Sequence, residues 1–220
     1  MPYTFLSRHL AGAVSAVLIG FVGTQSSYGQ SVRFAKAECA PPVWMNERLD
    51  YHAPGDQVRI KQIESNHFDR NVEALVKAKT GSLAGDIDFL LRYVPNHPRA
   101  LNSMLRLALR EKTPQPSGAG LPVECYFVRA LQFRPDEAAL STLYGTYLAR
   151  VGRPSEALQQ FEVAEKLTPD DPILLYNMGL VLVDLGDYER ARSHAEKAYA
   201  AGVDLPGLRE KLVKAGHWRN

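Results

Sequence analysis

The feature that most constrains the fold is a repeat with a period of 34 residues in the carboxyl-terminal half of the chain. Gly145 and Gly179 are separated by this distance, and so are Ala157 and Ala191. A fixed period of this length indicates tandem units of two helices, each of which buries its apolar face only against its neighbours. The sequence therefore predicts an all-α fold built from stacked helical hairpins.

The residues around the repeated positions have physical roles in such a hairpin. Glycine and alanine remove side chains where the paired helices pack closest, and Phe161 fills the space between successive hairpins. Pro169 ends a helix because it has no N–H to donate and clashes with the preceding turn. Asp171–Pro172 then begins the next helix with an acidic cap and a proline at the first helical position. Gly152 and Gly186 mark the tight turns within the two hairpins.

On these residues, Leu143–Asp204 resembles two tetratricopeptide repeats, and Pro98–Phe133 resembles a third with the loop Thr113–Gly120 inserted. Together with a weaker unit before Pro98, the resemblance covers roughly two thirds of the chain. It implies a right-handed superhelical solenoid of helix-turn-helix repeats, with an irregular N-terminal arm and a C-terminal capping helix. Families of this kind bind partners in a concave groove lined by the first helix of every hairpin, so the resemblance implies a protein or peptide partner.

The repeat register divides the chain into consecutive segments. The arm is expected to be extended, with a short helix near Val58–Ile63. In the degenerate first repeat, a poorly matching helix over Phe68–Lys79 precedes a helix that contains Ile87–Leu91. The capping helix begins at Pro206 and reaches Trp218, and it covers the apolar face that the last repeat would leave in water. The expected segments are a signal peptide at 1–29, the arm at 30–63, the degenerate first repeat at 64–97, a repeat with an inserted loop at 98–137, repeats at 138–171 and 172–205, and the capping helix at 206–220.

The first residues have the order of a secretory signal peptide. A basic start at Arg8 precedes an apolar run from Leu10 to Val22, and small or polar residues follow from Gly23 to Gln30. The small side chains of Ser27 and Gly29 predict cleavage after Gly29 and an exported, periplasmic protein with no membrane span after cleavage. The alternative is an uncleaved N-terminal anchor, but the apolar run is shorter than the roughly 20 residues that a membrane-spanning helix needs.

The two cysteines, Cys39 and Cys125, are far apart in the sequence. This spacing excludes a close metal-binding knuckle and a Cys-x-x-Cys redox pair. In an oxidising compartment a lone pair of cysteines often forms one disulfide, and closing a long loop contributes about 2–4 kcal/mol. We expect a bridge that ties the arm to the repeats. The alternative is two unpaired, buried thiols.

The resemblance also implies which residues line the groove. Four arginines on the first helices would donate to a partner's carboxylates. The alternative is that they form a solvated helix face. The paired lysine and asparagine positions used by family members that bind chaperone tails are not reproduced, so that ligand is not expected. The implied groove residues are Arg99, Asn102, Arg106, Arg110, Thr142, Thr146, Arg150, Tyr176, Leu180 and Asp184.

The sequence lacks the patterns typical of nucleic-acid binding, metal binding and catalysis. The formal net charge is only +2, which argues against a nucleic-acid ligand. No two of the six histidines have the i, i+4 spacing of a helical metal site, and the Gly-x-Ser-x-Gly and phosphate-binding glycine-rich motifs are missing. We therefore expect no enzyme, no metal and no cofactor. Asp86 and Asp88 are interpreted as a helix face, and His67 and His97 as exposed loop residues.

Three functions are consistent with these patterns. The leading hypothesis is an exported scaffold or adaptor that binds a protein or peptide partner. The second is a fixed accessory subunit of a cell-envelope complex, docked through Ser31–Ile63. The third is an enzyme with an unrecognised site between the arm and the first repeat, walled by Trp44, His67 and Asp69.

Overall fold

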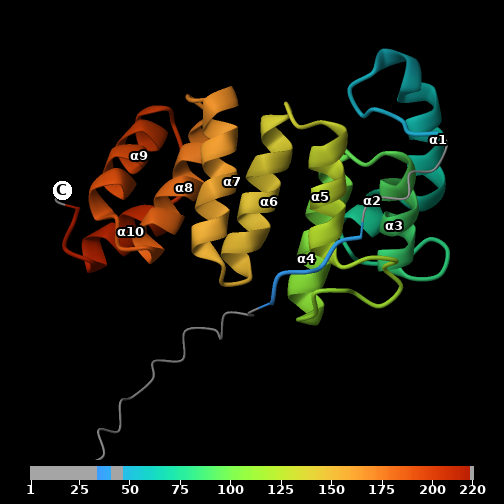
Figure 1. Cartoon of the computed structure of the whole chain (residues 1–220), viewed down its shortest axis with the longest axis horizontal. Coiled ribbons are helices and arrows are strands. Elements are labelled where there is room, and N and C mark those ends of the chain that lie inside the picture. The colour runs from blue at the N-terminus through green and yellow to red at the C-terminus, as the bar shows by residue number, and fades with distance from the viewer. Residues whose placement is uncertain (1–33, 41–46, 219–220) are drawn as a thin grey trace, which may run out of the picture. The chain divides into compact units, whose positions relative to one another are not determined.

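The computed structural model describes residues 34–40 and 47–218 (Figure 1). The expected signal peptide at 1–29 and the residue Trp44 lie outside the described residues. Within the described ranges the chain forms ten α-helices and one short 3-10 helix, and these ranges contain no strand. The prediction of an all-α fold is confirmed.

The helices follow one another along the chain with short connections. The longest connection in the described part joins α4 to α5 and is the proline- and glycine-rich loop that the sequence predicts. The bounds are η1 (Pro54–Asp56), α1 (Gln57–His67), α2 (Arg70–Glu73), α3 (Leu83–Tyr93), α4 (Pro98–Glu111), α5 (Val123–Phe133), α6 (Ala138–Arg150), α7 (Pro154–Leu167), α8 (Pro172–Asp184), α9 (Tyr188–Ala200) and α10 (Gly207–Lys214).

The two carboxyl-terminal hairpins repeat in register. α6 and α8 begin 34 residues apart, at Ala138 and Pro172, and α7 and α9 begin the same distance apart, at Pro154 and Tyr188. α6 packs against α7, α8 packs against α9, and α7 packs against α8 to join the two pairs. The first helices α4, α6 and α8 also contact one another in order. The two pairs are stacked helical hairpins with the 34-residue period that the sequence predicts.

Proline, aspartate and glycine set the helix boundaries as the sequence predicts. The Asp171 side chain accepts hydrogen bonds from the backbone N–H groups of Ile173 and Leu174, at 2.9 and 3.0 Å, and Pro172 is the first residue of α8. Gly152 and Gly186 have φ values of 77° and 80°, in the left-handed region that glycine adopts without a steric cost. The turns inside both hairpins therefore depend on glycine.

The repeated glycines lie at close contacts between helices. A Cβ atom on Gly145 would lie 2.6 Å from the Phe161 ring in α7. A Cβ atom on Gly179 would lie 2.5 Å from the side chain of Leu208, which belongs to the capping helix α10. Small size at these positions lets the helices approach, as the sequence predicts, and the second contact extends the packing to the end of the array.

The amino-terminal hairpin differs from the sequence-based prediction. The short helix expected near Val58–Ile63 is α1, which is longer and packs against α3. The prediction of a helix over Phe68–Lys79 is wrong, because only the four residues of α2 in this segment are helical. Leu75 has a φ of 60°, and the backbone N–H of Val76 donates to the carbonyl of Asn71 at 2.8 Å, so the chain turns away after α2.

A buried carboxylate holds the segment that follows α2. The backbone N–H groups of Lys79 and Thr80 donate to Asp86 at 2.6 and 3.1 Å, and the Thr80 hydroxyl donates to the same carboxylate. Burial raises the pKa of Asp86, but these hydrogen bonds outweigh burial and hold the pKa below its usual value. The interpretation of Asp86 and Asp88 as a helix face is therefore wrong. Both are buried, and Asp88 accepts a hydrogen bond from the Tyr126 hydroxyl.

The capping helix closes the carboxyl-terminal end of the array. Leu208 and Leu212 of α10 are fully buried against α8 and α9, where they join a small apolar cluster with Leu175 and Leu182. The helix ends at Lys214, four residues earlier than predicted. Trp218 still contributes to the cap, because its ring packs edge-on against Tyr199 at 5.9 Å between centroids.

The described part of the arm is attached to the repeats by a disulfide. Cys39 and Cys125 are bonded, with their Cα atoms 5.4 Å apart, which confirms the predicted pairing. Figure 1 shows residues 34–40 in blue, beside α5. The backbone N–H of Ala37 donates to the buried carboxylate of Glu124 at 2.7 Å, and Arg153 pairs with the same carboxylate at 2.8 Å.

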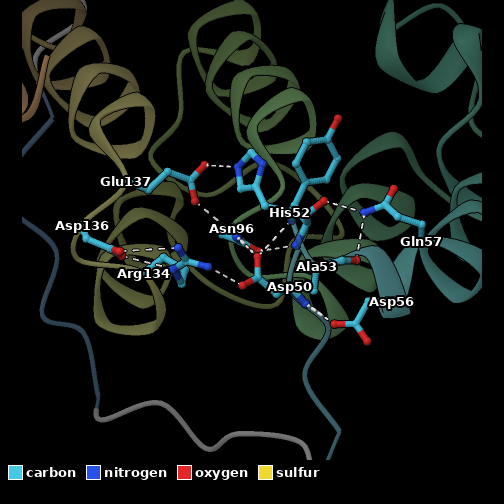
Figure 2. A network of polar contacts seen from close by, with 10 residues as sticks. Asp50, His52, Ala53, Asp56, Gln57, Asn96, Arg134, Asp136 and Glu137 are labelled. Carbon is cyan, nitrogen blue, oxygen red and sulfur yellow. Dashed lines mark hydrogen bonds and ion pairs between the residues drawn. The ribbon is translucent and has the colours of Figure 1, made fainter.

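Further along, the arm enters a polar network between the hairpins (Figure 2). The buried amide of Asn96 accepts from the backbone N–H of Tyr51 at 3.0 Å and donates to Asp50 at 2.9 Å and to Glu137 at 3.2 Å. Arg134 pairs with Asp50. This network satisfies the polar groups of the turn before η1 and fixes the arm against the start of α6.

Candidate binding groove

A cavity of about 530 Å³ lies between α6, α8 and the start of α10. Five residues that the sequence predicts for the groove line it: Thr146, Arg150, Tyr176, Leu180 and Asp184. The structure therefore brings together side chains from two successive first helices. The predicted residue Thr142 does not line the cavity; it lies one turn earlier in α6, and its hydroxyl donates to the Ala138 carbonyl at 3.0 Å.

The walls of the cavity combine apolar surface with a few polar groups. Phe161 and Val181 are buried and form an apolar floor, while Leu180 and Leu205 are more exposed. Asn177 adds an amide that can donate and accept. An apolar surface with a few convergent polar groups is typical of a ligand site.

The cavity is lined by two positively charged side chains and one negatively charged side chain. Lys211 of α10 donates to Asp184 of α8 at 2.5 Å, so these two charges offset each other. Arg150 is exposed at the end of α6 and forms no ion pair with any residue in the described ranges. The lining of the cavity therefore carries one positive charge that no described acidic side chain neutralises.

The cap supplies part of this site, which sequence reasoning did not predict. Gly207 and Lys211 of α10 line the cavity together with Leu205, the last residue of the predicted last repeat. The family pattern places groove residues only on the first helix of each hairpin, so it does not include the cap. These residues of the cap reach the cavity because α10 packs against α8.

The predicted arginines of α4 are engaged by the chain itself. Arg99 pairs with the Glu73 carboxylate of α2 at 2.6 Å, and this pairing raises the pKa of Arg99. Arg106 donates to the Glu73 carbonyl at 3.4 Å, and Arg110 donates to the Leu75 carbonyl at 2.6 Å. Residues of α2 and the turn after it therefore contact this face of α4, and the expectation that these three arginines bind a partner stays a prediction. The predicted residue Asn102 is exposed on the same helix.

The two histidines interpreted as exposed loop residues have structural roles, so that interpretation is wrong. His97 is fully buried, caps α4 by accepting from the backbone N–H of Ala100 at 3.2 Å, and contacts the Glu64 carboxylate at 3.0 Å. His67 is the last residue of α1 and lies 3.2 Å from Asp86. Both side chains contribute to the packing of the first hairpin.

Of the three residues proposed to wall a site between the arm and the first repeat, the structure describes His67 and Asp69. His67 lines a cavity of about 270 Å³ with Arg59, Asn66, Phe89 and Tyr93. Asp69 is not part of that cavity, because it caps α2 by accepting from the backbone N–H groups of Asn71 and Val72. His67 and Asp69 thus lie in different surroundings, one beside a cavity and the other at the start of α2.

In residues 34–40 and 47–218, no helix is long and apolar enough to span a bilayer. The same ranges hold no cluster of three or more histidine, cysteine, aspartate or glutamate side chains placed to bind a metal.

The chain matches no known protein-family profile. An uncharacterized protein of Haemophilus influenzae is 38% identical to it over 71 residues, which cover 29% of this chain and 73% of that protein. The chain belongs to the same family as the Haemophilus protein. The description of that relative names no activity, so membership in this family supplies no function.

Other similar proteins share only a segment with this chain. Protein FlbA of Caulobacter vibrioides is 24% identical over 146 residues, covering 64% of this chain and 24% of FlbA. The peroxisomal targeting signal receptor of Candida albicans is 35% identical over 72 residues, covering 33% of this chain and 12% of the receptor. The chain thus spans about a quarter of FlbA and about an eighth of the receptor. The solved structure of a point mutant of MamA is 16% identical, with a TM-score of 0.38, covering 66% of this chain and 92% of that one.

Proposed function

We propose that this chain is an exported interaction scaffold that binds a peptide segment of a protein partner in the groove between α6, α8 and α10. One observation carries the proposal: side chains from two first helices and the cap converge on one cavity of about 530 Å³. Sites of about 300–1,000 Å³ with an apolar floor and a few polar groups are common for small ligands, and a few peptide side chains have this size.

The relatives support a binding role. The Candida protein is described as a receptor for a peroxisomal targeting signal, and it is similar in sequence to this chain over 72 residues. Non-enzymatic binding is therefore the function that we assign to the groove, and no cofactor is part of the proposal.

Export is part of the same proposal. The disulfide between Cys39 and Cys125 supports it, because disulfides form and persist in oxidising compartments such as the periplasm. The order of basic, apolar and small residues over 1–29 supports it independently.

The contacts of the arm favour the scaffold over the accessory-subunit alternative. Phe34 and Leu49 are buried against the chain's own repeats. The backbone N–H of Phe34 donates to Val151, and that of Leu49 donates to Tyr93. Among the described residues of the arm, the apolar side chains of Phe34, Leu49 and Ile60 are thus already used within the molecule, whereas Val58 is 78% exposed.

The test is affinity capture from the native cell envelope with three forms of the mature chain as bait. Leu180→Arg places a long charged side chain in the groove. Ile173→Arg places the same side chain on the same helix, at a position that is 51% exposed and outside the cavity. We expect the wild type and Ile173→Arg to retain the same partner and Leu180→Arg to lose it. Equal capture by all three forms would contradict a groove-binding function.

A further inference from the structure

The first helices place one residue at the same register in three successive repeats. Arg110, Arg150 and Asp184 each lie twelve residues after the first residue of α4, α6 and α8. Since these helices contact one another in order, the three side chains occupy equivalent places along the groove side of the array. The groups that contact Arg110 therefore indicate which groups Arg150 can bind.

At the first of these positions, Arg110, the chain itself supplies the group that the arginine binds. The Arg110 guanidinium donates to the Leu75 carbonyl at 2.6 Å, just after the end of α2. About three turns earlier in α4, Arg99 binds the Glu73 carboxylate through two nitrogens, at 2.9 and 2.6 Å. The Ser103 hydroxyl donates to the Glu73 carbonyl at 3.0 Å. This face of α4 thus binds an acidic side chain together with the carbonyl groups that end a short helix.

At the second place the equivalent arginine faces a cavity. Arg150 lines the groove, and none of the described acidic residues pairs with it. The neighbouring Asp184 is neutralised by Lys211 at 2.5 Å. A ligand that brings a negative charge would therefore meet Arg150 without displacing an internal partner. The charge of the groove is complementary to an acidic segment.

We propose that the groove selects an acidic peptide segment, in which a carboxylate binds Arg150 and an adjacent apolar side chain packs over Leu180 and Leu205. This inference rests on the proposed function and specifies its ligand chemistry. Arginine suits this role because its planar guanidinium binds a carboxylate through two parallel hydrogen bonds. The apolar side chain supplies the contact that does not depend on charge, because it would cover Leu180, Leu205 and the floor formed by Phe161 and Val181.

The test uses a combinatorial library of hexapeptides that are acetylated at the amino end and amidated at the carboxyl end, so that only side chains carry the charge. The purified mature chain is screened against the library, and the affinities of selected peptides are measured by fluorescence anisotropy. We expect selection of aspartate or glutamate next to an apolar residue. Replacing the selected acid by its amide should weaken binding about tenfold or more.

Three variants separate the ligand chemistry from the binding function. Arg150→Gln should remove the preference for the acid, so that acidic and amide peptides bind alike. Asp184→Asn should strengthen binding of acidic peptides several-fold, because it releases the charge of Lys211 into the groove. Lys166→Gln removes an exposed positive charge from α7, outside the cavity, and should change nothing.

The outcomes distinguish two kinds of failure. Binding without an acid preference, or an acid preference that survives Arg150→Gln, overturns the inference and leaves the groove function standing. Failure of every peptide to bind more tightly to the wild type than to Leu180→Arg overturns the proposed function as well. Unchanged circular dichroism and thermal midpoints verify that each variant is folded.

Discussion

At the scale of single residues, Gly145 shows how the hairpin contacts depend on the absence of a side chain. A Cβ atom there would meet the Phe161 ring at 2.6 Å and the Ala157 carbonyl at 3.1 Å. We expect Gly145→Val to lower the free energy of unfolding by about 1–3 kcal/mol, because overpacking forces the neighbours to move. Urea denaturation measures the change. Gly81→Ala is the matched control, since nothing lies within 4 Å of its new Cβ atom, and an equal loss in both variants would contradict this account.

His97 gives a second residue-scale prediction, for pH. Burial lowers the pKa of His97, although its contact with Glu64 acts in the opposite direction. The unfolded chain therefore binds the proton at a higher pH than the folded chain does, and stability falls as the pH falls from about 6.5 towards the lowered pKa.

The comparison is between urea denaturation of the wild type and of His97→Asn at about pH 7.5 and about pH 5. Asparagine retains an oxygen that can cap α4 but does not titrate in this range. The wild type should lose more stability on acidification than the variant does. Parallel losses in the two proteins would show that His97 does not contribute to the pH dependence.

At the scale of elements, the arm depends on its covalent attachment. The disulfide joins Cys39 to Cys125 across 86 residues, and the Glu124 carboxylate accepts from Ala37 beside it. Replacing both cysteines by serine should cost about 2–4 kcal/mol, because the unfolded chain regains the freedom of a long loop. Thermal and urea denaturation with intact and substituted chains would measure this cost. An unchanged midpoint would show that the noncovalent contacts of the arm suffice.

The capping helix is the second element whose contribution can be measured. Leu208 is fully buried and fills the space beside Gly179, whereas Val213 on the same helix is 50% exposed. We expect Leu208→Ala to lower the free energy of unfolding by about 2–5 kcal/mol, the range for truncating a buried leucine. Val213→Ala should change it by no more than about 0.5 kcal/mol. A cap that did not stabilise the array would give two similar, small effects.

At the scale of the whole molecule, the parts with a strict repeat could be predicted from the sequence. The 34-residue period, with glycine at the close contacts and Asp171 before Pro172, determined the four helices from α6 to α9. These signals are local, because each residue acts on its own turn or on the helix directly before or after it. The disulfide was also predictable, since only two cysteines are present.

The first hairpin could not be predicted because the path of the chain after α2 depends on contacts between elements and on a backbone conformation that the residue types do not indicate. Leu75 adopts a positive φ that its residue type disfavours, and Asp86 captures the backbone of Lys79 from a different helix. Only part of the groove could be predicted, because some of its contacts also come from other elements. Arg150 and Asp184 follow from the register, but the engagement of Arg110 by Leu75 and the contribution of Lys211 depend on elements distant in sequence.

The central claim is that a partner segment binds where α6, α8 and α10 meet. The most direct measurement is a nitrogen-15 correlation NMR titration of the mature chain with an acidic peptide selected from the library. We expect the largest shifts on the backbone amides of Thr146, Leu180 and Lys211, which line the cavity. Shifts confined to α1 and α3, or to the outer helices α7 and α9, would contradict it.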